Sequence, residues 1–189
     1  YITDIAAWCN ISFFGNFSSN PLCYAENLYL NNELVTDLII PDGATKIGSY
    51  AFQDYDRLTS VNIPDSVTTI GERAFFRCAG LTSVTIGNGV TTIGDYAFWQ
   101  CTLLTSATIG NSVTTIGKDA FHGCKFTSIT IPDSVTTIGD SAFGSCGLIS
   151  VNIGSGVTSI GDYAFSWCNK LTNMTIPDSV TTIGDSAFY

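Results

Sequence analysis

The sequence repeats itself every 22 or 23 residues over most of its length, and this period restricts the chain to a repetitive fold. The pair Ala-Phe recurs with its phenylalanine at intervals of 23, 23, 23, 22, 22 and 23 residues, at Phe52, Phe75, Phe98, Phe121, Phe143, Phe165 and Phe188. An Ile-Gly pair begins five residues before each of them. One such repeat cannot bury its own apolar face, whereas stacked repeats bury a continuous one. The sequence therefore predicts a stack of coils.

Each unit reads in the same order. Apolar residues at positions 1, 4 and 6 of segment 58–63 predict a short strand with Val61 and Ile63 facing inward. A Pro-Asp-Ser or Gly-Asn-Gly/Ser turn follows, and then a Val-Thr-Thr-Ile-Gly segment supplies two more inward side chains. The Asp-Tyr-Ala-Phe segment at 95–98 predicts one short helical turn, with Asp95 as its N-cap and Phe98 filling the coil.

The unit at 81–101 carries a resemblance to a known family. It reads Leu-Thr-Ser-Val-Thr-Ile-Gly-Asn-Gly-Val-Thr-Thr-Ile-Gly-Asp-Tyr-Ala-Phe-Trp-Gln-Cys and resembles the leucine-rich repeat of BspA-like surface proteins. It has Ile-Gly-x-x-Ala-Phe where an ordinary leucine-rich repeat has its Asn ladder and Leu. The resemblance covers residues 35–189 and implies a leucine-rich-repeat solenoid, with short parallel β-strands on one face and turns or short helical turns on the other. It also implies a secreted or cell-surface protein, since some members are adhesins that bind host matrix proteins or other cells.

Residues 1–34 break the period and are expected to form an irregular or cap segment, while residues 35–189 form the solenoid with an incomplete last coil. The sequence around Cys9 echoes that around Cys168, which predicts that Cys9 belongs to the end of a preceding coil in the same register. Segment 28–34 predicts a small hairpin around Asn31 and Asn32, because both residues tolerate positive φ. For residues 1–34 as a whole, a separate ligand loop is the alternative to a cap.

Composition excludes several classes of partner. The chain has 7 Lys+Arg against 16 Asp+Glu, which argues against nucleic acid because phosphate binding needs clustered basic residues. No apolar run approaches the roughly 18 residues of a membrane span, so membrane insertion is not expected.

The cysteines follow the period rather than a disulfide pattern. Five of them occupy one repeat position, at Cys78, Cys101, Cys124, Cys146 and Cys168. Parallel side chains in a column about 5 Å apart rarely reach disulfide geometry, so buried free thiols are expected. Cys23 lies outside the column and is expected to be the most exposed. The absence of a Cys-x-x-Cys motif gives no support for zinc.

No candidate for catalysis, a metal or a cofactor emerges. The only histidine, His122, directly follows Phe121 at a position that elsewhere holds Gln, Phe, Trp, Gly and Ser, which predicts an outward loop site. Carboxylates recur twice per coil, as at Asp65 and Glu72, but turn-forming and helix-capping roles account for them without calcium. We therefore expect a protein that is not an enzyme.

What remains is the surface. The outward strand positions predict two columns of small hydrogen-bonding groups: Ser60, Asn62, Ser83, Thr85, Ser106, Thr108, Ser128, Thr130, Ser150, Asn152, Asn173 and Thr175. A second array begins at Thr68-Thr69, and both arrays can also be explained as keeping a solenoid soluble. Large aromatic residues interrupt the pattern and are expected to be exposed anchors: Phe76, Tyr96, Trp99, Tyr163 and Trp167.

These features predict a surface or secreted module for adhesion or protein binding, whose partner is an extracellular protein or glycan. A glycan-binding module is the alternative if the aromatic residues cluster on one face. A structural spacer, or a unit that stacks end to end, is the other alternative. Residues 177–189 favour stacking, because Val180, Ile183 and Phe188 have no following coil in this sequence, which predicts either self-association through that end or fraying there.

Overall fold

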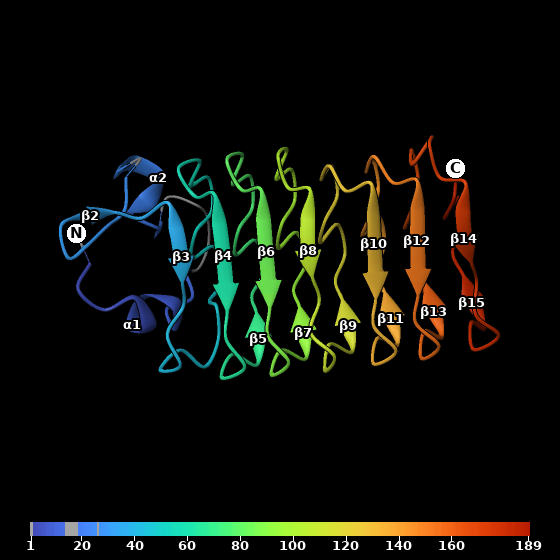
Figure 1. The fold of residues 1–189 in the computed structure, drawn as a ribbon, viewed down its shortest axis with the longest axis horizontal. Coiled ribbons are helices and arrows are strands. Elements are labelled where there is room, and N and C mark those ends of the chain that lie inside the picture. The colour runs from blue at the N-terminus through green and yellow to red at the C-terminus, as the bar shows by residue number, and fades with distance from the viewer. Residues whose placement is uncertain (1, 14–18, 26) are drawn as a thin grey trace.

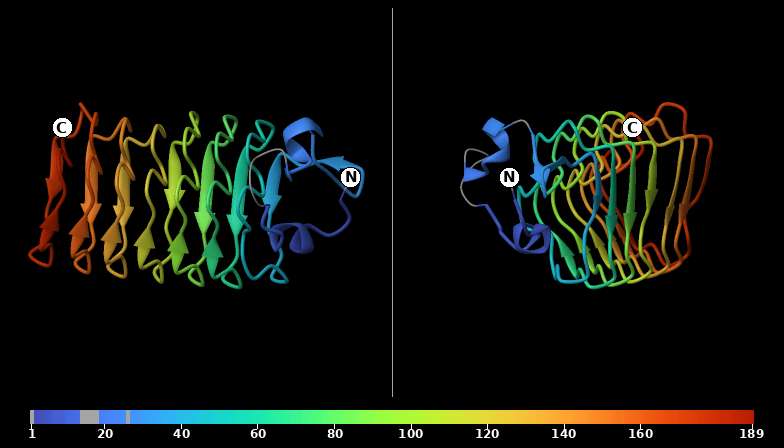
Figure 2. Two further views of the ribbon diagram at one scale, coloured as in Figure 1. Left: turned by 180° about the vertical axis from the view of Figure 1, so that it is seen from behind. Right: turned by 60° about the vertical axis from the view of Figure 1, so that its left-hand side comes forward.

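The computed structural model describes residues 2–13, 19–25 and 27–189 and shows an elongated stack of coils, each running once around the long axis (Figures 1 and 2). Successive coils lie side by side, with the N-terminal segment at one end and the C-terminus at the other. This confirms the predicted repeat solenoid with short parallel strands.

The longer strands of the coils form one side of the stack, which we call the β-face. They pair in parallel and in register, so that Val61 faces Val84 and Ile129 faces Val151. The β-face is in two pieces, one of four strands in the order β3-β4-β6-β8 and one of three in the order β10-β12-β14. The strands are β3 (Asp37–Ile39), β4 (Ser60–Ile63), β6 (Ser83–Ile86), β8 (Ser106–Thr108), β10 (Ser128–Ile131), β12 (Ser150–Ile153) and β14 (Asn173–Thr175).

A second sheet of two-residue strands lies behind the β-face (Figure 1). It is continuous, with six strands in the order β15-β13-β11-β9-β7-β5. Each strand places a threonine or serine outside and an isoleucine toward the core, as at Thr92 and Ile93. The strands are β5 (Thr69–Ile70), β7 (Thr92–Ile93), β9 (Thr115–Ile116), β11 (Thr137–Ile138), β13 (Ser159–Ile160) and β15 (Thr182–Ile183).

The segment around each Ala-Phe pair is not helical, so the predicted helical turn with an Asp N-cap is wrong. Tyr96 and Gln100 have φ of 58° and 54°, in the left-handed region that an α-helix does not use. Every second N–H in this segment donates to the next coil instead of to its own, as Phe75 N does to Ala97 O at 2.8 Å. The hydrogen bonds between coils thus require a backbone geometry that an α-helix does not have.

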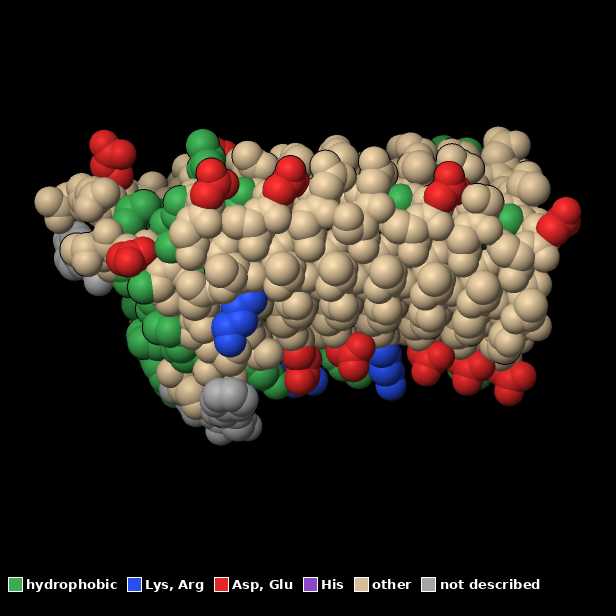
Figure 3. Space-filling model, turned by 90° about the horizontal axis from the view of Figure 1, so that it is seen from below, with side chains coloured by type: hydrophobic (Ala, Val, Ile, Leu, Met, Phe, Trp, Pro, Cys, Tyr) green, Lys and Arg blue, Asp and Glu red, His purple; other side chains and the backbone are tan. Residues whose placement is uncertain are grey.

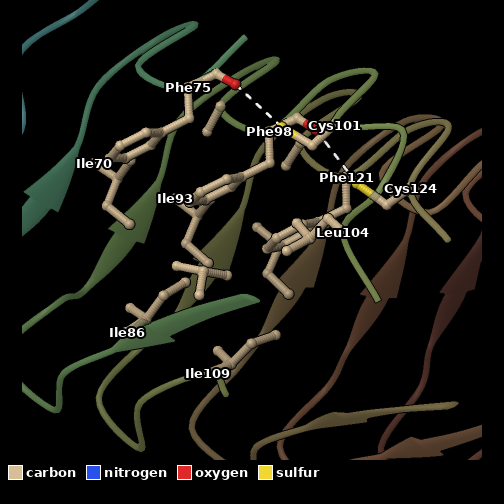
Figure 4. Close-up of a cluster of buried hydrophobic side chains, with 14 of the residues drawn as sticks. Ile70, Phe75, Ile86, Ile93, Phe98, Cys101, Leu104, Ile109, Phe121 and Cys124 are labelled. Carbon is tan, nitrogen blue, oxygen red and sulfur yellow. Dashed lines mark hydrogen bonds between the residues drawn. The ribbon is translucent and has the colours of Figure 1, made fainter. Parts of the chain in front are cut away.

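The phenylalanine of each Ala-Phe pair lies in the centre of the stack (Figure 4). Neighbouring rings are nearly parallel, with centroids 5.1 to 5.5 Å apart and interplanar angles of 2° to 12°. Rings from Phe52 to Phe143 are fully buried. The spacing follows from the coil repeat, because parallel strands lie about 4.8 Å apart and the rings are carried by successive coils.

The N-terminal segment contains helices α1 (Ile5–Cys9) and α2 (Leu22–Ala25) and a hairpin of β1 (Tyr29–Leu30) and β2 (Glu33–Leu34). The hairpin is antiparallel, and Asn31 and Asn32 have φ of 52° and 70°, which confirms the predicted Asn-Asn turn. The assignment of Cys9 to the end of a preceding coil is wrong, because this residue lies in a helix. Its carbonyl accepts from Gly48 N at 2.7 Å, as Ile47 O does from Gly71 N, so Cys9 stands at the isoleucine position.

The same segment pairs the hydrogen-bonding groups that the first coil would otherwise leave open. The buried Asn20 side chain donates to Tyr50 O and Ala51 O at 2.6 and 3.1 Å, and Trp8 Nε1 also donates to Ala51 O at 3.0 Å. Asn10 Oδ1 accepts from Thr45 N at 3.2 Å. A solenoid end needs such cover because its strand edge is otherwise unpaired.

Truncation of one central ring tests the importance of this column. We expect Phe98→Ala to lower the free energy of unfolding by about 3–5 kcal/mol, because the cavity lies between two rings that cannot close over it. Urea denaturation followed by circular dichroism measures the loss, with Thr85→Ala on the exposed face as the control. A loss for Phe98→Ala no larger than that of the control would contradict the central role of the column.

Candidate binding surface

The β-face presents small polar side chains in regular columns. Along β4, β6 and β12 the residues are half-buried, buried, exposed and buried in turn, as the alternation of a strand requires. Val61 and Ile63 are 3% and 1% exposed, whereas Asn62 between them is exposed. The predicted outward residues from Ser60 to Thr175 therefore all lie on this face, at its surface or half-buried in it.

The charge on these columns is confined to Asp37 in β3, at the N-terminal edge of the β-face. Its carboxylate accepts from Ser60 Oγ at 2.6 Å and from Thr59 Oγ1 at 2.9 Å. These hydrogen bonds, first that of Ser60, lower the pKa of Asp37 below its ordinary value. The other outward side chains of these columns, from Ser60 to Thr175, carry no charge.

Threonine hydroxyls fix the edges of the face. Thr82 Oγ1 donates to Thr59 O at 2.9 Å, and Thr105 Oγ1 donates to Thr82 O at 3.4 Å. A parallel series runs along the second sheet, where Thr91 Oγ1 donates to Thr68 O at 3.1 Å. These hydroxyls join one coil to the preceding one, which removes rotational freedom from side chains that also face solvent.

Two hollows lie on the β-face. The first, of about 440 Å³, opens between β8 and β10 and is lined by Thr105, Ser106, Ala107, Thr108, Ile109, Asn111, Ser128, Ile129, Thr130 and Pro132. The second, of about 410 Å³, lies over β10, β12 and β14 between Ser128 and Thr175. No charged side chain lines either hollow, so both suit neutral ligands with hydrogen-bonding groups.

The aromatic residues predicted as anchors lie away from the β-face, and only some of them are exposed. Tyr163 and Trp167 are 47% and 58% exposed, as expected. Phe76 and Trp99 are half-buried because their rings stack on each other at 4.7 Å. Tyr96 is also half-buried, with the Arg73 guanidinium 4.8 Å from its ring centroid. Their predicted exposure is therefore wrong for Phe76, Trp99 and Tyr96, because neighbouring coils bring equivalent side chains into contact.

His122 is not an outward loop side chain, which corrects the prediction from its variable position. Its side chain is 25% exposed, its ring lies 6.3 Å from that of Trp99, and Nδ1 lies 3.4 Å from Asp119 Oδ1. The next coil has Gly144 at this position, and a Cβ there would lie 2.8 Å from Nδ1. The imidazole thus fills the space that a glycine leaves. Burial, above all, raises the pKa of Asp119.

The repeated cysteines form the predicted column of buried thiols. Cys101 Sγ donates to Phe75 O at 3.2 Å and Cys124 Sγ donates to Phe98 O at 3.3 Å (Figure 4). Cys9 and the five column cysteines are all free and buried. Burial raises the pKa of every one of them, that of Cys9 to about 12. The side chain of Cys23 lies outside the described part of the structure.

The recurring carboxylates accept backbone hydrogen bonds from the following coil instead of capping helices. Asp95 Oδ1 accepts from Lys118 N at 2.9 Å, and Asp133 Oδ1 accepts from Ser155 N at 2.7 Å. Figure 3 shows acidic side chains in two rows along the underside, with a band between them that is mostly uncharged and holds a basic side chain toward the N-terminal end. Among the described residues, no three His, Cys, Asp or Glu side chains are grouped to hold a metal ion. None of the described helices is long and apolar enough to cross a membrane.

The hollow between β8 and β10 was not predicted, although the sequence contains its signals. Ala107 stands where other coils have valine or another large apolar residue, and Phe126 stands where they have leucine. The first 22-residue interval also begins at Phe121. Each of these changes alone is compatible with a regular coil. Only the occurrence of all three at neighbouring coils indicates where the hollow lies.

Comparison with known proteins identifies this arrangement. The model of the BspA type leucine rich repeat region matches the chain in six copies, over residues 25–149 and 93–189. The chain belongs to the BspA-type leucine-rich repeat family. No protein of curated function matches it.

Solved structures of leucine-rich repeat proteins share the fold. A leucine rich cell surface protein from Faecalibacterium prausnitzii is 39% identical with a TM-score of 0.74, and the match covers 82% of this chain and 45% of that one. The T. pallidum leucine rich repeat protein is 29% identical with a TM-score of 0.75, over 79% of this chain and 73% of that one. A leucine-rich repeat protein from Eubacterium ventriosum is 28% identical with a TM-score of 0.77, over 85% and 44%. This chain thus spans less than half of the first and third of these proteins.

Thiol labelling tests the column. We expect iodoacetamide at pH 8 to leave Cys9 and the five column cysteines unmodified in the native protein, because burial keeps their thiols protonated and out of reach. All of them should react in urea. Mass spectrometry of peptides reports both states, and a disulfide or rapid native labelling between Cys78 and Cys168 would contradict the packing described here.

Proposed function

We propose that this chain is a non-catalytic recognition module of a secreted or cell-surface protein, which acts in adhesion by binding an extracellular protein through its β-face. The observation that carries the proposal is the β-face itself. It presents outward hydroxyl and amide groups on six coils, and bonds between the coils hold its edges in place. A stiff surface loses little conformational entropy when it binds, so many weak polar contacts can add up to useful affinity.

Sequence similarity to a cell-surface protein supports a cell-surface location. The relative from Faecalibacterium prausnitzii is described as a leucine rich cell surface protein, and it is 39% identical to this chain. The family model covers nearly all of the solenoid. This chain spans only 45% of that relative. The proposal therefore concerns this chain and not the anchoring or the other domains of a whole protein.

A role without catalysis fits the distribution of titratable groups. The single histidine is packed against Trp99 and Asp119, away from both hollows of the β-face. The six thiols that the structure describes are buried and protonated, so they are poor nucleophiles. The lining of both hollows has no acid or base to transfer a proton.

Bulky charged substitutions on the β-face test the proposal. We expect the chain to bind at least one protein of a purified extracellular-matrix panel, and Thr85→Arg or Asn152→Arg to weaken that binding by about tenfold or more, since each buries an unpaired charge in the contact. Surface plasmon resonance measures the affinities.

Thr69→Arg is the matched control, because Thr69 is equally exposed but lies in the second sheet. Its binding should equal that of the unmodified chain. If Thr69→Arg weakens binding as much as Thr85→Arg does, or if no protein of the panel binds, the β-face is not the adhesive surface.

End-to-end association of the chain as given is a second candidate, favoured by the exposed face of its last coil, and it is a proposal about this chain alone. Its end face exposes Ile176, Ile183 and Phe188, which are 40%, 47% and 37% exposed, although the equivalent residues of inner coils are buried. Exposed apolar groups beside an unpaired strand edge promote association. The first coil is covered by the N-terminal segment, so a second copy would meet this one through their C-terminal ends.

Lysine substitutions at this end face distinguish stacking from a monomer. We expect light scattering at high protein concentration to show a dimer, and Val180→Lys with Ile183→Lys to return the chain to a monomer by placing like charges in the contact. Thr158→Lys, on the flank of an inner coil, is the control and should leave the dimer intact. A monomer at all concentrations would remove stacking as a function of this chain.

A further inference from the structure

The β-face is interrupted at one joint between two coils, whereas the sheet behind it continues through the same joint. In the second sheet β9 pairs with both β7 and β11, so the coils of β8 and β10 remain properly stacked there. On the β-face β8 ends one sheet and β10 begins the next. We call the space between them, which is the 440 Å³ hollow, the slot.

Hydrogen bonds that recur at other joints are missing across the slot. Thr82 N donates to Thr59 O at 2.8 Å, and the same bond joins β12 to β10, but the described residues include no such bond from Thr127 to Thr105. Farther along the strands, Ile40 N donates to Asn62 O at 3.0 Å. The equivalent bond, from Ile109 N to Thr130 O, is also missing among the described residues, so neither group has its usual backbone partner there, although Lys125 N donates to Leu104 O at 2.8 Å at the beginning of the same joint.

The cause is a change of packing in the core beneath the slot. Phe126 takes the leucine position and packs edge-on against Phe121, with ring centroids 5.7 Å apart and planes at 66°. The chain between Cys124 and Phe126 is also one residue shorter than that between Cys101 and Leu104. Ala107, which pairs with Val84, is the smallest side chain at its repeat position. The slot is therefore a feature of the folded core and not a frayed edge.

The width of the slot selects the kind of group that fits. Cα atoms of β8 and β10 still approach within 8 Å, whereas an inserted β-strand needs about 9.6 Å between its neighbours. A single oxygen atom that accepts from one edge and donates to the other needs less room, since each hydrogen bond spans about 2.8–2.9 Å. A hydroxyl group does both, and an ammonium or carboxylate does not.

We infer that the slot is a binding site for a neutral oligosaccharide. Sugar hydroxyls bridge the free backbone groups of Ile109 and Thr130, while Ser106, Thr108 and Asn111 offer further partners at the rim. The half-buried side chain of Ala107 offers apolar carbon to the C–H groups of the sugar ring, while Ile109 and Ile129, which are 6% and 5% exposed, form the floor beneath it. The volume of 440 Å³ lies within the range of small-molecule sites. The inference rests on the proposed recognition role and names the chemistry recognised at one place on the β-face.

Titration calorimetry with the whole chain tests this assignment. The probes are the neutral hexasaccharides of maltose, cellulose, chitin and mannan type, with hexagalacturonate as the charged comparison. We expect a neutral probe to bind and Thr108→Arg to weaken it by about tenfold or more, because the new side chain fills and charges the rim. Thr69→Arg, which is exposed on the second sheet, should leave it unchanged.

Amide hydrogen exchange gives an independent reading of the slot. The N–H of Ile109 should exchange at least about tenfold more slowly when the neutral probe is bound, since the probe supplies its missing partner. The N–H of Ile40, already bonded, should not change. Saccharide binding that survives Thr108→Arg, or that leaves Ile109 exchange unaltered, overturns the assignment to the slot.

The outcomes also separate this inference from the proposed function. If no neutral probe binds, while a matrix protein binds and loses affinity with both Thr85→Arg and Thr108→Arg, the slot serves a polypeptide and the saccharide assignment fails alone. If a neutral probe binds and depends on Thr108, while no matrix protein depends on Thr85, the saccharide site stands and the protein-adhesion function fails.

Discussion

The constraint on which this structure depends is that each coil must present the same hydrogen-bonding edge to its neighbour at the spacing of a parallel sheet. Two strands and the Ala-Phe segment of each coil all donate to adjacent coils. Polar side chains also form hydrogen bonds between coils. Thr82 and Cys101 donate to carbonyl groups of the preceding coil, and Asp95 accepts from a backbone N–H of the following coil. The phenylalanine column follows at the same interval and fills the space that the backbone defines.

Repetition explains why much of this architecture could be predicted from the sequence. Because equivalent residues must share an environment, the period placed Val61 inside and Asn62 outside without further information. The hairpin at Asn31 and Asn32 was predictable for a different reason, since a two-residue turn is decided locally. Predictions failed where a local preference competed with stacking: the segment at Tyr96 has a capping residue, yet its donors turn to the next coil.

The candidate site was predicted in outline but not in its most particular feature. The columns of the β-face follow from alternation, whereas the slot depends on how Ala107, Phe126 and a shortened connection act together across two coils. His122 shows the same difficulty. Its repeat position holds many residue types, which suggested an exposed site. The residue type at this position depends on the side chain at the same position of the neighbouring coil, as Gly144 beside the His122 imidazole shows.

The interrupted joint also gives the molecule a mechanical weak point. A stack pulled along its long axis carries the load through every joint in series, so the joint with the fewest bonds decides where it parts. At the β8–β10 joint the second sheet and the Ala-Phe ladder carry the load, without the help of the longer strands. Extension under tension therefore begins in the middle of the solenoid, and a ligand that bridges the slot would strengthen the joint by adding bonds across it.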